Sequence, residues 1–135
     1  MGIEARTVVL VEDDPDLQFL TTLMLTRAGF VVRAYDDARE AVPACIASPP
    51  DAVVLDWMLP GMTGLEALRL LRADEATADV PVVMATACGF TENITAAMDS
   101  GAQGYLVKPF STDELTSCVT GAIESAGRQL VGMGV

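Results

Sequence analysis

Five polar side chains that could do chemistry stand at, or directly after, the ends of short apolar runs: Glu12, Asp13, Asp56, Thr86 and Lys108. A carboxylate at the end of an apolar run is unusual, because an ionised carboxylate is costly to remove from water. Three carboxylates, one hydroxyl and one ammonium could together hold a hard divalent cation and a phosphoryl group. That chemistry requires the fold to bring the five side chains to one place.

Asp56 is the most informative of the five, because it lies between Leu55 and Trp57 with no local structural reason for a charge. Oxygen ligands without histidine favour Mg²⁺ or Mn²⁺. In such a site Asp56 could attack phosphorus as a nucleophile and form an acyl phosphate, while the metal and Lys108 stabilise the equatorial oxygens. The residue types therefore predict phosphoryl transfer to Asp56.

The elements that must position these residues alternate between short apolar strands and amphipathic helices. Continuous apolar strands separated by helices are typical of a parallel sheet covered on both faces. Five such units predict a doubly wound α/β fold with strand order 2-1-3-4-5, whose ligands bind beyond the carboxyl ends of strands one and three. We predict strands over Thr7–Val11, Phe30–Tyr35, Ala52–Leu55, Val80–Thr86 and Tyr105–Val107.

The predicted strand order brings the carboxylates of Asp13 and Asp56 close together. At about 5 Å and an effective dielectric near 20 the two charges repel by roughly 3 kcal/mol, so we expect a bound cation or a shifted pKa.

Local signals predict where the helices begin and end. Asp14 is expected to cap the first helix with Pro15 at its first position, and Gly29 to end it. Thr63 and Ser111 each open a capping box. Pro43 is expected to kink or shorten the second helix. We also expect one apolar face on the first helix, made by Leu17, Leu20, Met24 and Ala28.

Charge and composition limit the partners. The 19 acidic and eight basic residues give a net charge of −11, which argues against direct binding to nucleic acid or to an anionic membrane. No apolar run approaches the roughly 18 residues of a membrane span, and the start lacks a signal-peptide pattern, so a soluble cytoplasmic protein is expected. The chain has no histidine, so it contains no histidine phosphodonor of its own.

Four stretches carry a resemblance to a known family: "VVLVEDDPDL", "DAVVLDWMLPGMTGLEAL", "VPVVMATA" and "GAQGYLVKPF". Thirty positions separate Asp56 from Thr86, and 22 separate Thr86 from Lys108. With these motifs and spacings, residues 7 to about 125 resemble the receiver domain of two-component response regulators. The resemblance implies a receiver domain over residues 1–125, followed by a tail or linker remnant over 126–135.

The resemblance also implies roles for individual residues. Asp56 would be the phosphoacceptor, charged by a sensor histidine kinase or a phosphotransfer protein. Asp13 and Asp56 would bind Mg²⁺ (or Mn²⁺) directly, Glu12 would act largely through water, and the backbone carbonyl of Met58 would complete the protein ligands. Lys108 would contact the phosphoryl oxygens, and the Lys108–Pro109 bond would be cis.

Thr86 and Tyr105 match the switch pair of the family. The resemblance implies that the Thr86 hydroxyl moves toward the phosphoryl group, that Tyr105 rotates inward, and that the face of the fourth helix, fifth strand and fifth helix repacks to control an unknown downstream protein. The same face could support a homodimer. Met58 and Cys88 occupy two positions that tune hydrolysis in the family, and neither is polar enough to position water, so we expect slow self-dephosphorylation.

The resemblance implies a signalling switch, with enzymatic character limited to weak self-phosphorylation and self-dephosphorylation. Three alternatives remain. Asp14 and Asp16 around Pro15 mimic the nucleophile motif of haloacid-dehalogenase-like phosphatases, although the proline argues against it. A flavodoxin-like cofactor binder would share the sheet, but "EDDPD" would repel flavin phosphate. A degenerate receiver used only for protein contacts would not need the complete set of site residues.

Overall fold

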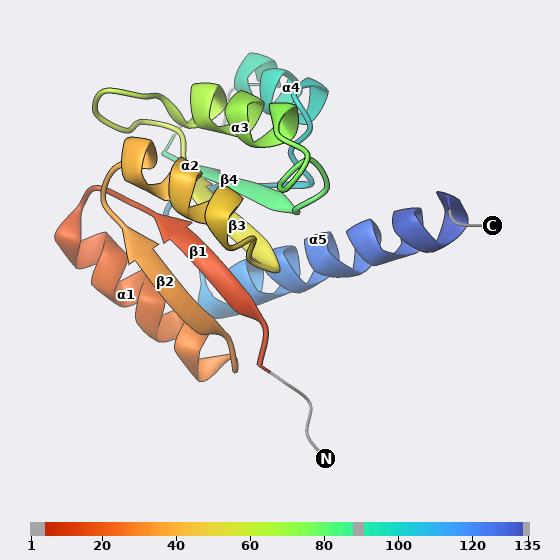
Figure 1. The fold of residues 1–135 in the computed structure, drawn as a ribbon. Helices are drawn as coiled ribbons and strands as arrows, with labels where there is room; N and C mark the ends of the chain where they lie inside the picture. The colour runs from red at the N-terminus through yellow and green to blue at the C-terminus, as the bar shows by residue number, and fades with distance from the viewer. Residues whose placement is uncertain (1–4, 88–90, 134–135) are drawn as a thin grey trace.

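A computed structural model describes residues 5–87 and 91–133 of the chain, which form a five-stranded parallel sheet with helices on both faces (Figure 1). The strand order is β2-β1-β3-β4-β5, which confirms the predicted doubly wound α/β fold. The strands are β1 (Thr7–Val11), β2 (Val31–Tyr35), β3 (Ala52–Asp56), β4 (Val82–Thr86) and β5 (Gly104–Val107). The helices are α1 (Pro15–Arg27), α2 (Ala38–Ala47), α3 (Gly64–Ala73), α4 (Thr91–Asp99) and α5 (Thr112–Met133).

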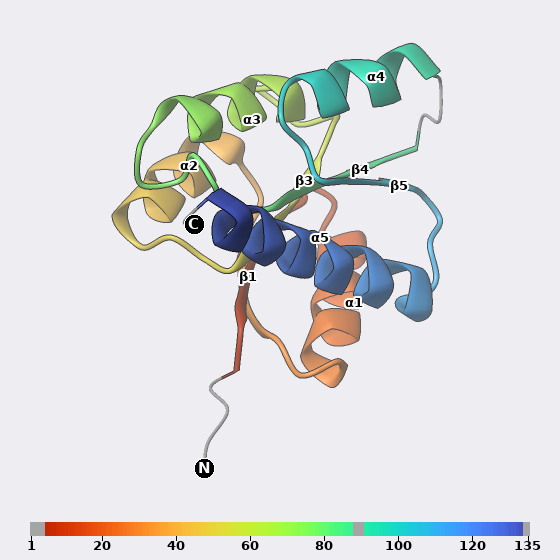
Figure 2. The same cartoon turned by 90° about the vertical axis from the view of Figure 1, so that its right-hand side faces the viewer.

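The sheet separates two apolar cores, because side chains of a strand alternate between its two faces. One core joins α2, α3 and α4 to residues such as Val53, Leu55 and Met84. The other joins α1 and α5 to residues such as Leu10 and Val54. Figure 2 shows α3 and α4 on one side of the sheet, and α1 and α5 on the other. Strands β1, β3 and β4 are therefore buried on both faces.

The predicted helix caps are present. The Asp14 carboxylate accepts hydrogen bonds from the backbone N–H groups of Asp16 and Leu17, with Pro15 at the first position of α1. Gly29 follows the end of α1 with a φ of 100°, a conformation that glycine adopts without strain. Thr63 and Glu66 form the capping box of α3, and Ser111 and Glu114 exchange the corresponding hydrogen bonds before α5.

Several boundaries differ from the sequence-based expectation. Strand β3 ends one residue later than predicted, at Asp56, and β5 begins one residue earlier, at Gly104. Strands β2 and β4 begin at Val31 and Val82, one and two residues later than predicted. Helix α2 continues through Pro43 to Ala47. Helix α5 continues to Met133, through most of the segment 126–135 that we predicted to be a tail or linker. Within the described part of the chain, no helix has the length and apolar character needed to cross a membrane.

The expected apolar face of α1 is not the most buried face of that helix. Its buried residues are Thr21 and Leu25, whereas Leu17 and Leu20 are 38% and 45% exposed. Helix α1 follows β1, so its first turns lie at the carboxyl edge of the sheet, where they overhang the strands. Leu17 and Leu20 instead line a cavity with Met24 at this edge.

Candidate functional site

The polar residues predicted to form a site do gather at the carboxyl edge of the sheet. Glu12 and Lys108 stand two residues beyond Leu10 and Leu106, which belong to the core between the sheet, α1 and α5. Asp56 likewise stands two residues beyond Val54 of that core. The period of two along a strand therefore directs all three side chains toward the same face.

Lys108 joins two buried carboxylates. Its Nζ lies 2.6 Å from Glu12 Oε1 and 3.3 Å from Asp56 Oδ2. Glu12 is 4% exposed and Asp56 is 6% exposed, so both charges are largely removed from water. Glu12 is fixed further by its neighbours, since its Oε2 accepts from the Asp14 N–H and its carbonyl accepts from the Gln18 side chain. The single ammonium of Lys108 thus contacts two carboxylates, one of which is held in place by further hydrogen bonds.

This arrangement shifts the pKa values of the site. Burial raises the pKa of Asp56 to about 6, the charge of Glu12 acts in the same direction, and Lys108 opposes both. Burial tends to lower the pKa of Lys108, but its hydrogen bond to Glu12 and the charge of Asp56 hold that pKa above its usual value. The protein's own side chains therefore leave this site short of positive charge.

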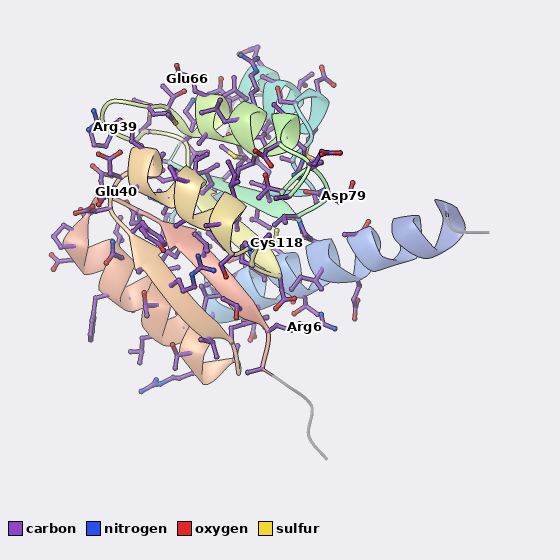
Figure 3. All side chains as sticks on the ribbon, in the orientation of Figure 1. Arg6, Arg39, Glu40, Glu66, Asp79 and Cys118 are labelled. Carbon is purple, nitrogen blue, oxygen red and sulfur yellow. The ribbon has the colours of Figure 1, made fainter. Side chains whose placement is uncertain are left out.

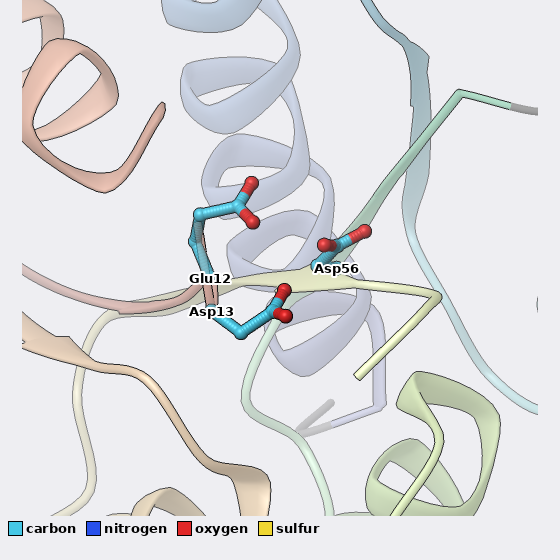
Figure 4. A group of neighbouring side chains, drawn as sticks. All are labelled: Glu12, Asp13 and Asp56. Atoms are coloured by element: carbon cyan, nitrogen blue, oxygen red, sulfur yellow. The ribbon is translucent and has the colours of Figure 1, made fainter. Parts of the chain in front are cut away.

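Asp13 supplies a third carboxylate, and the geometry fits a hard cation. Glu12, Asp13 and Asp56 each offer a carboxylate oxygen, and these atoms lie within 4.8 Å of one another (Figure 4). Asp13 is exposed, whereas the other two are buried, so the cluster opens to solvent on the side of Asp13. All-oxygen ligands with excess negative charge are those that Mg²⁺ prefers.

Thr86 and Tyr105 lie on adjacent strands beside this cluster. Val82 and Met84 belong to the core under α2, α3 and α4, so alternation along β4 places Thr86 on that face. Tyr105 is partly buried, pairs in register with Met84, and packs against the same core. The backbone N–H of Lys108 donates to the Thr86 carbonyl at 2.7 Å. The predicted switch pair therefore shares one face of the sheet.

The remaining predicted residues lie around the site. The Lys108–Pro109 peptide bond is cis, as the resemblance implied. The side chain of Met58 is 71% exposed. Cys88 lies outside the described residues. Figure 3 shows two charged residues near the start of α2, Arg39 and Glu40; the guanidinium of Arg39 lies against the loop at Gly61.

Gly64 is a positioning residue that the sequence analysis missed. A Cβ atom at Gly64 would lie 2.2 Å from the Asp56 carbonyl oxygen and 2.9 Å from Trp57 Cα. The Gly64 N–H also donates to the Trp57 carbonyl at 2.9 Å. The first turn of α3 thus packs directly on the backbone that carries Asp56. The sequence did contain one indication of this packing, because a glycine stands at the first position of the helix although no turn requires a glycine there.

Replacing Gly64 with alanine is expected to lower the free energy of unfolding by roughly 2 to 4 kcal/mol, because the atoms in contact are backbone and cannot rotate away. The end of β3 must shift, so Mg²⁺ affinity should fall as well. Urea unfolding and Mg²⁺ titration would measure the two effects. Gly121→Ala is the control, since a Cβ there meets nothing within 4 Å; equal stability of the two variants would contradict the expectation.

Comparison with known proteins agrees with this geometry. The family model described as "Response regulator receiver domain" matches residues 8–120. The chain belongs to the response regulator receiver domain family. Residues 8–120 include the whole sheet except Thr7, the first residue of β1, and all the site residues discussed above. The carboxylate cluster with its lysine is thus part of the region that defines the receiver domain.

Relatives with established names contain this receiver domain as one part of a longer chain. The phosphate regulon transcriptional regulatory protein PhoB of Pseudomonas aeruginosa is 33% identical over 122 residues, which are 90% of this chain and 53% of that protein. The DNA-binding response regulator MtrA of Mycolicibacterium smegmatis is 40% identical over 119 residues, 88% of this chain and 51% of that protein. The receiver domain thus spans about half the length of these relatives.

A solved structure resembles the receiver domain along nearly its whole length. The receiver domain of the sensor histidine kinase PA1611 from Pseudomonas aeruginosa PAO1 superposes with a TM-score of 0.83 and 30% identity, covering 90% of this chain and 99% of that one. That structure carries a magnesium ion coordinated in its active-site cleft. Membership of the receiver domain family rules out the alternative of a haloacid-dehalogenase-like phosphatase. Asp14, which that alternative took as part of a nucleophile motif, caps the N-terminus of α1.

Proposed function

We propose that this receiver domain is a phosphorylation-dependent signalling switch with Asp56 as the phosphoacceptor. The observation that carries the proposal is Lys108, whose ammonium contacts both Glu12 and Asp56 in a cluster that also includes Asp13. A lysine between two buried carboxylates is suited to hold a phosphoryl group on one of them, because the transferred group carries charge on its equatorial oxygens.

The proposed reaction uses few groups of the protein. An Asp56 oxygen attacks phosphorus, the bond from phosphorus to the donor breaks, and the electron pair leaves with the donor. Lys108 then places its ammonium against the phosphoryl oxygens. Asp13 and Asp56, the Met58 carbonyl and, through water, Glu12 would hold Mg²⁺; Mn²⁺ fits the same oxygen ligands. A bound divalent cation supplies the positive charge that the cluster lacks.

The proposed response involves the switch pair. A phosphoryl oxygen on Asp56 would attract the Thr86 hydroxyl through a charge-assisted hydrogen bond. Movement of Thr86 would free space for Tyr105 to rotate toward the core under α2, α3 and α4. The face made by α4, β5 and α5 then repacks, and the phosphoryl group shifts the population between two packings.

The proposed partners follow from this chemistry. The chain has no histidine, which supports donation of the phosphoryl group by a sensor histidine kinase or phosphotransfer protein. The repacked α4–β5–α5 face would bind a downstream protein or a second copy of the chain. The charge of −11 argues against direct contact with nucleic acid or an anionic membrane. We place the protein in the cytoplasm, and we propose only weak self-phosphorylation and self-dephosphorylation of its own.

The test is incubation with acetyl phosphate or beryllium fluoride, with and without Mg²⁺. Intact mass should show one added phosphoryl group per chain with acetyl phosphate, only when Mg²⁺ is present. Trp57, the single tryptophan, adjoins Asp56 and should change its fluorescence when either reagent binds. A phosphoryl group on a residue other than Asp56, or equal labelling with and without Mg²⁺, would refute the proposal.

Self-dephosphorylation is expected to be slow. The exposed side chain of Met58 offers no hydrogen bond that would orient a water molecule toward the phosphoryl group. We expect Met58→Asn to hydrolyse faster than the unchanged protein, by several-fold. Loss of radiolabelled phosphate over time measures both rates. A phosphoryl half-life of only seconds for the unchanged protein would contradict the expectation.

A further inference from the structure

An apolar cavity adjoins the proposed phosphorylation site at Glu12 and Lys108. Its volume is about 390 Å³, and Glu12 and Lys108 line one part of it. The other lining residues come from α1 and from the loop between β5 and α5, and they are Leu17, Leu20, Thr21, Met24, Pro109 and Phe110, with Ala87 from the end of β4. The cavity therefore places an apolar surface beside the ammonium that contacts Asp56.

The apolar walls are an unusual surface for a chain of this charge. Leu17 and Leu20 are 38% and 45% exposed, although apolar side chains on a helix normally face the core. The cavity is large enough for a small organic group, because an apolar cavity of about 150 Å³ already holds a benzene ring. A ligand with a phosphoryl group at Lys108 could bury an attached alkyl or aryl group here.

We propose that the site accepts phosphoryl groups from acyl phosphates with an apolar acyl chain in preference to acetyl phosphate. This inference rests on the proposed function of Asp56. In the reaction, an Asp56 oxygen forms a bond to phosphorus, the bond between phosphorus and the acyl oxygen breaks, and the electron pair leaves on the carboxylate of the donor. No proton or oxidant is required. The acyl chain lies in the cavity against Leu20 and Met24 while the phosphoryl group is transferred.

Butyryl phosphate is the appropriate probe, because its leaving carboxylate has almost the same basicity as acetate and differs only by two methylene groups. Burial of a methylene is worth about 0.8 kcal/mol, and tenfold corresponds to about 1.4 kcal/mol. Partial burial of both therefore predicts a second-order rate constant roughly five- to tenfold higher for butyryl phosphate. Intact mass against time, with Mg²⁺ present, measures both rate constants.

Two glutamine substitutions on the same helix separate the cavity from a general effect. Leu20→Gln makes a cavity wall polar and should reduce the ratio of the two rate constants to near one, while labelling by acetyl phosphate continues. Phe19→Gln is the matched control, because Phe19 is 72% exposed and does not line the cavity. It should leave the ratio unchanged.

The outcomes distinguish the inference from the proposed function. Equal rate constants in the unchanged protein, or an unchanged ratio in Leu20→Gln, would overturn the inference while labelling of Asp56 by acetyl phosphate still supports the switch. If neither donor labels Asp56 in the folded, Mg²⁺-bound protein, the proposed function fails and the inference fails with it. A higher ratio that only Leu20→Gln abolishes would support the inference.

Discussion

Asparagine at position 56 is expected to abolish phosphorylation completely. The amide has nearly the same shape as the carboxylate but cannot attack phosphorus, so acetyl phosphate should add no mass in the presence of Mg²⁺. The other site carboxylates cannot substitute, because Glu12 is already bound to Lys108 and Asp13 lies on the open side of the cluster. Asp36→Asn removes a charge from an exposed aspartate and should leave labelling unchanged.

The same substitution is expected to stabilise the metal-free protein. The pKa of Asp56 is raised from 3.8 to about 6 in the folded chain, so the folded state favours the protonated form. The stability that this group contributes is fully present below about pH 4 and is lost as the pH rises through 6. At pH 7 the ionised carboxylate costs up to roughly 3 kcal/mol.

Asp56→Asn should recover part of this cost, about 1 to 2 kcal/mol, since it also weakens the contact with Lys108. Urea unfolding at pH 4 and pH 7 in the presence of a chelator measures the difference. The two proteins should be similar at pH 4 and differ at pH 7, and Mg²⁺ should stabilise the unchanged protein more than the variant. Lower stability of Asp56→Asn at pH 7 without metal would contradict the expectation.

Replacing Lys108 with methionine should have the second large effect, and it should lower both the free energy of unfolding and the phosphorylation rate. Removing the ammonium leaves Glu12 and Asp56 as unpaired charges that are almost fully buried. Breaking a buried ion pair from one side is strongly destabilising, and we expect a loss of roughly 2 to 4 kcal/mol without metal. The phosphorylation rate should fall by roughly 100-fold, because the positive group that we propose to contact the phosphoryl oxygens is lost.

Two further variants serve as controls for the Lys108→Met result. Arg69→Met removes an exposed cation from α3 and should change neither property appreciably. Glu12→Gln combined with Lys108→Met removes both members of the closest ion pair, so it should recover part of the lost stability without recovering the phosphorylation rate. A Lys108→Met protein that retains its rate would show that the ammonium does not act on the phosphoryl group.

Features that depend on near neighbours in sequence could be predicted well. The cap at Asp14 and the capping boxes at Thr63 and Ser111 are local hydrogen-bond patterns, and all three are present. The strand order followed from the alternation of apolar strands and helices. The gathering of Glu12, Asp13, Asp56 and Lys108 then followed from topology, because parallel strands end at the same edge of a sheet.

Features that depend on contacts between distant segments could not be predicted in the same way. The requirement for glycine at position 64 arises from the backbone at Asp56, which only the folded chain brings against it. The apolar residues Leu17 and Leu20 fitted a helical stripe, but the sequence did not show that this stripe extends past the sheet. The continuation of α5 was readable in part, since Leu115, Val119, Ala122 and Ala126 repeat at helical spacing and are buried.

The hydrogen bond from the Lys108 N–H to the Thr86 carbonyl has a consequence for how a signal would cross the sheet. This bond joins the backbone of Lys108, which follows β5, to the backbone of Thr86 at the end of the neighbouring parallel strand β4. A shift of one strand end along the other would break this hydrogen bond, so we expect a phosphoryl group on Asp56 to act first on side-chain torsion angles. In the proposed switch, side-chain rotations at Thr86 and Tyr105 would therefore come first, and the repacking of the α4–β5–α5 face would follow while β4 and β5 keep their register.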